Sequence, residues 1–204
     1  MKIAIIGAGR LGSALGKRLV QAGHEVLYGG ADAASSTQAT RDRVTNARAA
    51  EFGEVVVLAV PFHKIGQAID QTAGMLTGKV LWSCVNAVLP DASGLAVGFD
   101  TSAAEQVARH AQGARVVSAL PPFADVLASE NVTFGGHRPT VFLCSDDQSA
   151  KTDVTRLIQD LGAEPVDAGP LTTSRLVEPA MMLLVAIAYG SPAPRTVGLK
   201  LLER

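Results

Sequence analysis

Aromatic residues and cysteines are scarce in this sequence. Aromatic side chains make up 4% of the 204 residues, so the core has to be built from Ala, Val, Leu and Ile, which suits strands covered by helices on both faces. The two cysteines, Cys84 and Cys144, lie in apolar runs and have no CxxC partner. We expect both to be buried small side chains in a reducing compartment, which argues against a redox pair.

An excess of charge of either sign and long apolar runs are also lacking. The chain has 18 basic and 19 acidic residues and a net charge of −1, unlike a protein that binds nucleic acid or a membrane surface. The longest apolar run, residues 176–190, is shorter than the roughly 20 residues of a membrane helix and includes Glu178 and Pro179. We therefore expect a cytoplasmic protein without nucleic-acid or membrane partners.

Strand-like and helix-like segments alternate along nearly the whole chain. Strands separated by helical crossovers predict an α/β fold of the doubly wound Rossmann type, with a mostly parallel sheet. Residues 1–135 are expected to form the Rossmann domain, and residues 136–204 a small C-terminal α/β extension of the same unit that ends in a helix. The sequence predicts strands at residues 2–6, 25–28, 55–60, 79–84, 115–120, 140–145 and 164–167, and helices at 10–22, 63–75, 103–112, 149–161 and 173–189.

A glycine-rich turn between the first strand and the first helix is the strongest chemical signal. Gly7 permits a tight turn, Gly9 lets the backbone approach a pyrophosphate, and Gly12 lets the helix pack closely on the strand. Free amides at the helix N-terminus and the positive end of its dipole favour an anion there. The turn therefore predicts an NAD(P)-binding site formed by Gly7, Ala8, Gly9, Arg10, Leu11 and Gly12.

The end of the second strand normally reports which dinucleotide is bound. A carboxylate there selects NAD by holding the ribose diol, whereas a serine–arginine or asparagine–arginine pair holds the phosphate of NADP. In this sequence Gly30 and Ala31 occupy the diagnostic place, and Asp32 follows. Asp32 could fold back toward a diol, and Arg41 or Arg43 could reach a phosphate. NADP(H) is mildly favoured and NAD(H) remains an alternative.

Residues after the next two strands are expected to complete the crevice, because ligands of such folds bind at the carboxyl ends of the strands. Ala59, Val60 and Pro61 are expected to wall the adenosine and ribose, although Pro61 also has the plain role of ending the strand. Asn86 is expected to bind the nicotinamide ribose or amide, unless it is an ordinary turn residue.

Motifs for hydrolysis or metal binding are missing. There is no Ser/His/Asp set, zinc spacing or P-loop, so we assign no catalytic residue and no metal ligand. His63 and His137 could contact a substrate, and Lys64 is expected to face solvent. An alcohol dehydrogenase needs a general acid or base. Hydride transfer between two organic carriers needs only that donor and acceptor stack at short distance.

The sequence resembles the NADPH-dependent reductase family of the deazaflavin coenzyme F420. The resemblance rests on four blocks in the family's order, and the last block is the most specific. It implies NADPH in the N-terminal crevice, a deazaflavin stacked on its nicotinamide and partly covered by the C-terminal segment, hydride transfer between the two, and a homodimer. The blocks are KIAIIGAGRLGSALGKRLVQAGHEV from residue 2, LAVP from residue 58, GARVV from residue 113, and LGAEPVDAGPL with SRLVEP between residues 161 and 179.

Two places differ from the family's pattern. Gly30 and Ala31 replace a serine–arginine pair, and residues 118–122, Ser-Ala-Leu-Pro-Pro, replace a stretch with an Asn-Thr motif near the hydride acceptor. The second change removes polar contacts and adds rigidity where the second substrate is expected. A flavin is therefore an alternative acceptor.

Other functions and roles stay open at this point. A small-molecule hydroxyacid or imine dehydrogenase and a catalytically silent dinucleotide sensor are the alternatives to the reductase. The roles of Arg175 and Glu178 also stay open, since this pair could form a dimer contact, an ion pair at a helix start, or part of the acceptor pocket.

Overall fold

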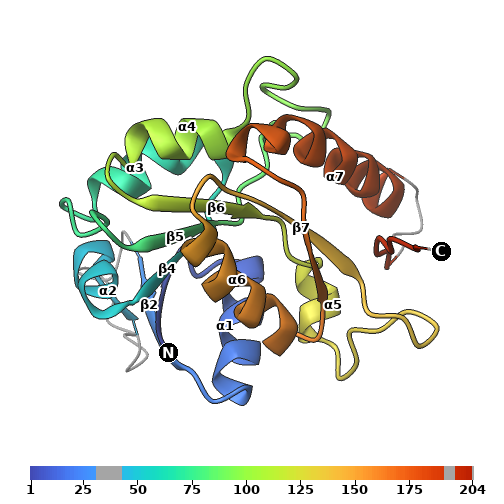
Figure 1. The fold of residues 1–204 in the computed structure, drawn as a ribbon, viewed down its shortest axis with the longest axis horizontal. Helices are drawn as coiled ribbons and strands as arrows, with labels where there is room; N and C mark the ends of the chain where they lie inside the picture. The colour runs from blue at the N-terminus through green and yellow to red at the C-terminus, as the bar shows by residue number, and fades with distance from the viewer. Residues whose placement is uncertain (31–42, 191–195, 204) are drawn as a thin grey trace.

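One eight-stranded sheet lies between two layers of helices in the computed structural model, which describes residues 1–30, 43–190 and 196–203 (Figure 1). The strand order is β3-β2-β1-β4-β5-β6-β7-β8, and all neighbours run parallel except β6 and β7. The strands are β1 (Lys2–Ile6), β2 (Glu25–Gly29), β3 (Arg43–Val44), β4 (Val55–Leu58), β5 (Val80–Ser83), β6 (Arg115–Ala119), β7 (Thr140–Cys144) and β8 (Glu164–Asp167).

The order of the strands determines where a ligand can bind. The chain winds outward from β1 in one direction through β2 and β3, and in the other direction from β4 through β6. The crossovers on the two sides of β1 therefore diverge, which leaves a crevice beyond the carboxyl ends of β1 and β4. The predicted doubly wound, mostly parallel sheet is confirmed.

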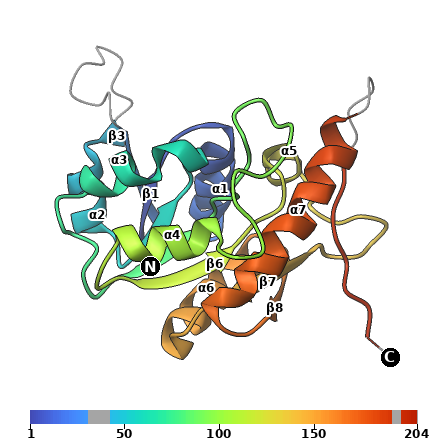
Figure 2. The same cartoon turned by 90° about the horizontal axis from the view of Figure 1, so that it is seen from above.

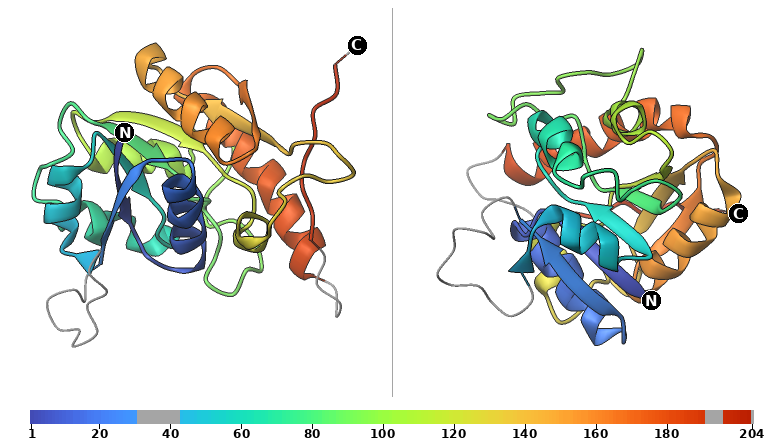
Figure 3. Two further views of the ribbon diagram at one scale, coloured as in Figure 1. Left: turned by 90° about the horizontal axis from the view of Figure 1, so that it is seen from below. Right: turned by 90° about the vertical axis from the view of Figure 1, so that its left-hand side faces the viewer.

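Helices cover both faces of the sheet. α1 (Arg10–Gln21), α5 (Ala124–Ala128) and α6 (Gln148–Asp160) lie on one face, as the left panel of Figure 3 shows for α1 and α6. The other face carries α2 (Asn46–Phe52), α3 (Ile65–Asp70) and α4 (Ala103–His110), and α7 (Ser174–Tyr189) packs beside α4. Two short 3-10 turns, η1 (Phe62–Lys64) and η2 (Leu171–Thr173), precede α3 and α7.

The strands are apolar on both faces because both faces are buried. On β1, Ile3 and Ile5 pack toward α1, whereas Ala4 and Ile6 pack toward α2 and α3. Trp82 on β5 is fully buried, and its indole Nε1 donates a hydrogen bond of 2.8 Å to the carbonyl oxygen of Ala119 on β6. Small aliphatic side chains fill the rest, as the low aromatic content predicts.

Three short elements were not predicted from the sequence. Helix α2 starts where Thr45 Oγ1 accepts a hydrogen bond from the backbone N–H of Arg48, and β3 lies just before it. Helix α5 lies in the segment 123–139 that was expected to be a loop. Seven, two and five residues are too few for apolar periodicity to reveal an element.

The predicted helix over residues 63–75 is wrong in length. It divides into η1 and the six-residue α3. Thr72 Oγ1 donates to the carbonyl oxygen of Ile69, and Ala73 has a φ of 52°, so the chain turns out of the helical path at this point.

The final segment docks on its own chain. The carbonyl oxygen of Leu199 accepts a hydrogen bond from Thr140 N, and Leu201 N donates to Thr140 Oγ1, both at the start of β7. Lys200 pairs with Glu164 on β8. Figure 2 shows this segment running along the outer side of α7.

The expected division of the chain into a Rossmann domain of residues 1–135 and a C-terminal extension of residues 136–204 stays a prediction.

Within the described residues, one helix is long and apolar enough to span a membrane by length and composition alone. It covers residues 171–189, has a mean hydropathy of 1.4, and is 28% buried within the chain. A core or interface helix of a globular protein meets the same criteria.

Candidate functional site

The turn between β1 and α1 has the geometry that its glycines predict. Gly7 has a φ of 104°, and a β-carbon at this residue would lie 2.4 Å from the carbonyl oxygen of Ala59. A β-carbon on Gly12 would lie 2.0 Å from the carbonyl oxygen of Gly7. Both glycines are therefore required for the close packing of β1, the start of α1 and the end of β4.

Gly9 differs from the other two glycines of the turn. It is the N-cap residue of α1, it has extended backbone angles, and within the described part of the chain no atom lies within 4 Å of the position of its β-carbon. No side chain caps the first turn of α1, and this turn carries no acidic residue. The amide groups at the start of α1 thus face open space, as an anion-binding turn requires.

The end of β2 lies next to this turn. Gly7 N donates to the carbonyl oxygen of Gly29, and no atom of the described residues lies within 4 Å of the position of a β-carbon on Gly30. Ala31, Asp32 and Arg41 lie outside the described residues, and the backbone alone of Arg43 is described.

Asn46, at the start of α2, is a residue that the sequence analysis missed. Its Nδ2 donates to Gln71 Oε1 at 2.8 Å, whereas its Oδ1 is buried without a hydrogen-bond partner among the described residues. Oδ1 lies 2.7 Å from the position of a β-carbon on Gly29. The sequence does not indicate that Asn46 lies beside the end of β2, because an asparagine in a polar segment is usually an ordinary surface residue.

The end of β4 forms the wall opposite the turn. Ala59 N donates to the carbonyl oxygen of Ile6, and Val60 Cγ1 lies 2.9 Å from the position of a β-carbon on Gly7. Val60 is half-buried and Pro61 is exposed. The structure brings Ala59 and Val60 against Gly7 of the glycine turn, and Pro61 follows them in the chain; their role as a wall of the adenosine site stays a prediction.

A largely apolar pocket of about 250 Å³ continues the crevice past the start of α1. Arg10 and Leu11 line one side, and residues after β5 and β6 line the floor. Met181, Val185 and Tyr189 of α7 form the remaining wall. The ring of Tyr189 meets that of Phe123 edge to face, with centroids 5.9 Å apart. The sequence analysis missed these three α7 residues, because a helix with apolar residues on every face does not show which side lines a pocket.

Asn86 also lines this pocket, but much of its side chain is occupied within the chain. Nδ2 donates to the backbone carbonyl oxygen of Glu178 at 3.2 Å, and Oδ1 is buried with no partner among the residues described. Asn86 is therefore not an ordinary turn residue, because it connects the end of β5 to α7.

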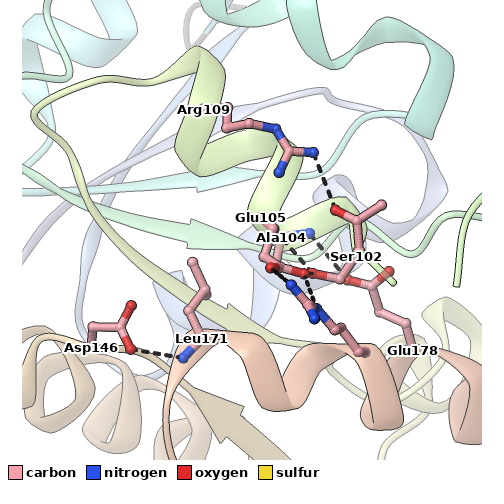
Figure 4. A network of polar contacts seen from close by, with 9 residues as sticks. Ser102, Ala104, Glu105, Arg109, Asp146, Leu171 and Glu178 are labelled. Carbon is pink, nitrogen blue, oxygen red and sulfur yellow. Dashed lines mark hydrogen bonds and ion pairs between the residues drawn. The ribbon is translucent and has the colours of Figure 1, made fainter. Parts of the chain in front are cut away.

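Arg175 and Glu178 connect α7 to α4 within one chain. Figure 4 shows Glu178 of α7 facing Ala104 and Glu105 of α4. The guanidinium of Arg175 binds both carboxylate oxygens of Glu105, at 2.9 and 2.6 Å, and this pairing lowers the pKa of Glu105. Glu178 is 1% exposed and accepts hydrogen bonds from the backbone N–H groups of Ala103 and Ala104. Burial raises the pKa of Glu178 to about 7, although these hydrogen bonds act in the opposite direction. Arg175 thus forms its ion pair with Glu105 of α4, whereas Glu178 caps the start of α4 through its carboxylate, so the two residues do not pair with each other in the contacts described.

The remaining candidates lie away from the pocket or are inert. His63 is exposed in η1 and His137 is exposed in a turn, and neither lines the pocket. Cys84 and Cys144 are both free and buried, as predicted, and burial raises the pKa of each thiol. Among the described parts of the chain, no group of three or more His, Cys, Asp or Glu residues could hold a metal ion.

The comparison with known proteins identifies relatives along the whole chain. Residues 2–87 match the family model described as "NADP oxidoreductase coenzyme F420-dependent". The F420-dependent NADP reductase of Methanothermobacter marburgensis is 33% identical and covers 91% of both chains. The chain belongs to the F420-dependent NADP reductase family. A further family member, from Methanocaldococcus jannaschii, is 26% identical over 92% of both chains.

Solved structures agree with this family. A putative F420-dependent NADP reductase from an Arthrobacter species covers both chains completely, with a TM-score of 0.85 and 27% identity. An imine reductase from Myxococcus stipitatus shares the fold at 18% identity and a TM-score of 0.64, and this chain spans 60% of its length. The imine dehydrogenase alternative is therefore not favoured.

We expect alanine at Gly12 to destabilise the protein and alanine at Gly9 to leave its stability nearly unchanged. Gly12→Ala forces a methyl group against the Gly7 carbonyl and should lower the free energy of unfolding by about 1–3 kcal/mol or more. Gly9→Ala has room and should change it by less than about 1 kcal/mol. Urea denaturation followed by circular dichroism measures both, and equal losses would contradict the packing described.

Proposed function

We propose that this protein transfers a hydride between NADP(H) and a planar acceptor, a deazaflavin of the F420 type or a flavin. The observation that carries the proposal is the continuity of the site. The uncapped amides at the start of α1, beside the open side of Gly9, lead past the side chains of Arg10 and Leu11 into an apolar pocket that is large enough for a ring. The relatives named as F420-dependent NADP reductases support the same reaction.

The residues present fit a dinucleotide. Residues 7–12 would hold the pyrophosphate on their amides, since a phosphate oxygen can approach Gly9 without meeting a side chain. The adenosine ribose would lie between Gly30 on one side and Ala59, Val60 and Pro61 on the other. Ala31 and Asp32, which follow Gly30 in the sequence and lie outside the described residues, are further proposed contacts of the cofactor. Asn86 would contact the nicotinamide end, where its buried Oδ1 is an acceptor still without a partner among the described residues.

The pocket provides an environment for direct hydride transfer. When bound, the nicotinamide ring supplies or takes up the hydride. Of the residues that line the pocket, Arg10 alone carries a charge, and the Cys84 thiol is kept neutral by burial. The apolar walls exclude water and hold two flat rings in contact, which lowers the barrier by proximity and orientation. An acceptor that has gained a hydride can take its proton from solvent, so the reaction needs no acidic or basic side chain of the protein.

The acceptor side of the pocket is rigid and apolar. Pro121 and Pro122 line it in place of the polar residues that the resemblance leads one to expect. A proline fixes its φ and donates no hydrogen bond from its nitrogen. These residues therefore favour recognition of a flat ring by shape, and they suit a deazaflavin or a flavin better than a small hydroxyacid.

A second copy of the chain is our proposed partner for α7, giving a homodimer. Leu176, Ala180, Leu183 and Ile187 form a stripe at spacings of four, three and four residues, which is the pattern of a helix–helix seam. Leu176 and Leu183 are 64% and 62% exposed, and Ile187 is 41% exposed. Covering this stripe with the same stripe of a second copy removes the apolar surface from water.

We also propose that the protein is cytoplasmic, with α7 as an interface helix.

Binding and turnover test the proposed reaction. We expect calorimetry to show micromolar binding of NADPH and weaker binding of NADH, and Gly9→Ala to weaken NADPH binding by at least roughly ten-fold. Absorbance at the nicotinamide band should fall when a deazaflavin or a flavin is added to NADPH and enzyme. Binding of neither dinucleotide, or binding without turnover of any planar acceptor, would exclude the reaction.

The dimer is tested by charge at the seam. Leu183→Glu places two carboxylates in the proposed interface, so light scattering on a sizing column should show a monomer where the wild type is a dimer. Val20→Glu, at an exposed apolar position on α1, is the matched control and should remain dimeric. A dimer in both variants would show that α7 is not the interface.

A further inference from the structure

The helix that forms one wall of the pocket makes its polar contacts with α4 near its N-terminal end, whereas its C-terminal end is held by apolar contacts such as that of Tyr189 with Phe123. Arg175 and Glu178 make the polar contacts of α7 with α4, whereas Met181, Val185 and Tyr189, which line the pocket, come later in the helix. The outward stripe of α7 is exposed along the same stretch. The position of Met181, Val185 and Tyr189 in the pocket wall therefore depends on the contacts of Arg175 and Glu178, which lie one to three helical turns earlier in α7.

Glu178 completes the cap of α4. A helix begins with N–H groups that have no partner within the helix. In α4, Ser102 Oγ accepts from Glu105 N at 3.1 Å, while Ala103 N donates to Glu178 Oε2 at 2.8 Å and Ala104 N donates to Oε1 at 3.1 Å. A carboxylate at this position also interacts favourably with the helix dipole. Both carboxylate oxygens of Glu178 are thus needed to hold α7 against the start of α4.

The backbone of the same residue reaches the opposite side of the pocket. The carbonyl oxygen of Glu178 accepts the hydrogen bond from Asn86 Nδ2, and Asn86 lines the pocket beyond β5. Glu178 therefore joins three parts: the start of α4 through its side chain, the segment after β5 through its carbonyl, and the α7 wall through the helix itself.

Pro179 makes the docking contact more important. A proline has no N–H, so the carbonyl oxygen of Arg175 loses its normal partner four residues on. The helix is weakest at this turn, directly after Glu178 and directly before Met181. The segment beyond Pro179 takes its direction from the contact that holds Glu178.

We infer that Glu178 is a positioning residue, which sets the separation between the α7 wall and the Asn86 wall and thereby determines how tightly the acceptor ring is held. The inference rests on the proposed function, since it takes this pocket to be the place where the acceptor stacks on the nicotinamide. The glycine turn, which would hold the rest of the dinucleotide, makes no contact with Glu178 in the hydrogen bonds described.

Glu178→Gln tests the inference. The amide keeps one acceptor oxygen but turns an NH₂ group toward a backbone N–H, so one docking hydrogen bond is lost. We expect the KM for the deazaflavin to rise roughly five- to ten-fold, while the Kd for NADPH measured by calorimetry changes less than two-fold. The matched control is Glu51→Gln, which removes a carboxylate from a surface ion pair on α2 and should change neither constant.

Amide hydrogen exchange gives a readout that needs no substrate. In Glu178→Gln the amides of residues 180–189 should exchange at least several-fold faster than in the wild type, while those of β1 and α1 are unchanged. An unchanged KM together with unchanged exchange would overturn the inference, and so would an equal loss of NADPH binding. If Glu178→Gln fails to fold, Glu178→Asp, which is too short to reach both N–H groups, is measured in the same way. Absence of deazaflavin turnover by the wild type would reject the proposed function, and hydrogen exchange would still decide the role of Glu178.

Discussion

The close contact between the β1–α1 turn and the end of β4 is the constraint on which the site depends. The Gly7 carbonyl lies where a side chain on residue 12 would begin, and the Ala59 carbonyl lies where a side chain on residue 7 would begin. This contact brings the N-terminus of α1 directly over the crevice between the diverging halves of the sheet. An anion bound there interacts with free amides and with the helix dipole, which are already in place before binding.

The second half of the site is built differently. The pocket beyond Arg10 depends on α7, a helix that packs on α4 and exposes a stripe of apolar residues that includes Leu176, Leu183 and Ile187. A few polar contacts around Arg175 and Glu178 fix its position, and the ring contact between Phe123 and Tyr189 closes its far end. A rigid dinucleotide turn is thus combined with an acceptor wall that has fewer restraints, which suits a site where one reactant enters and leaves above another.

The sequence was most informative where local geometry allows few residue types. The glycine turn could be predicted because no residue other than glycine fits the close backbone contacts at Gly7 and Gly12. The strands could be predicted because both of their faces are buried and therefore apolar. The pocket wall on α7 could not be read, because Met181 and Val185 do not differ in type from the exposed Leu183 and Ile187.

Contacts between residues far apart in the chain also could not be predicted from the sequence. The link from Glu178 to the start of α4 spans 75 residues, and the unpartnered oxygen of Asn46 lies beside a strand that comes earlier in the chain. At the end of β2, Gly30 carries no side chain, so no side-chain contact of this residue selects between NADP and NAD.

The central claim is that donor and acceptor rings meet directly in the α7 pocket, without a protein group that carries the hydrogen between them. The most direct measurement uses NADPH with deuterium on the hydride-donating carbon, mixed with enzyme and deazaflavin in ordinary water, followed by mass spectrometry of the reduced acceptor. The account predicts that the transferred deuterium is retained in the product. Loss of the deuterium to water would contradict it, because the hydrogen would then have passed through an exchangeable site.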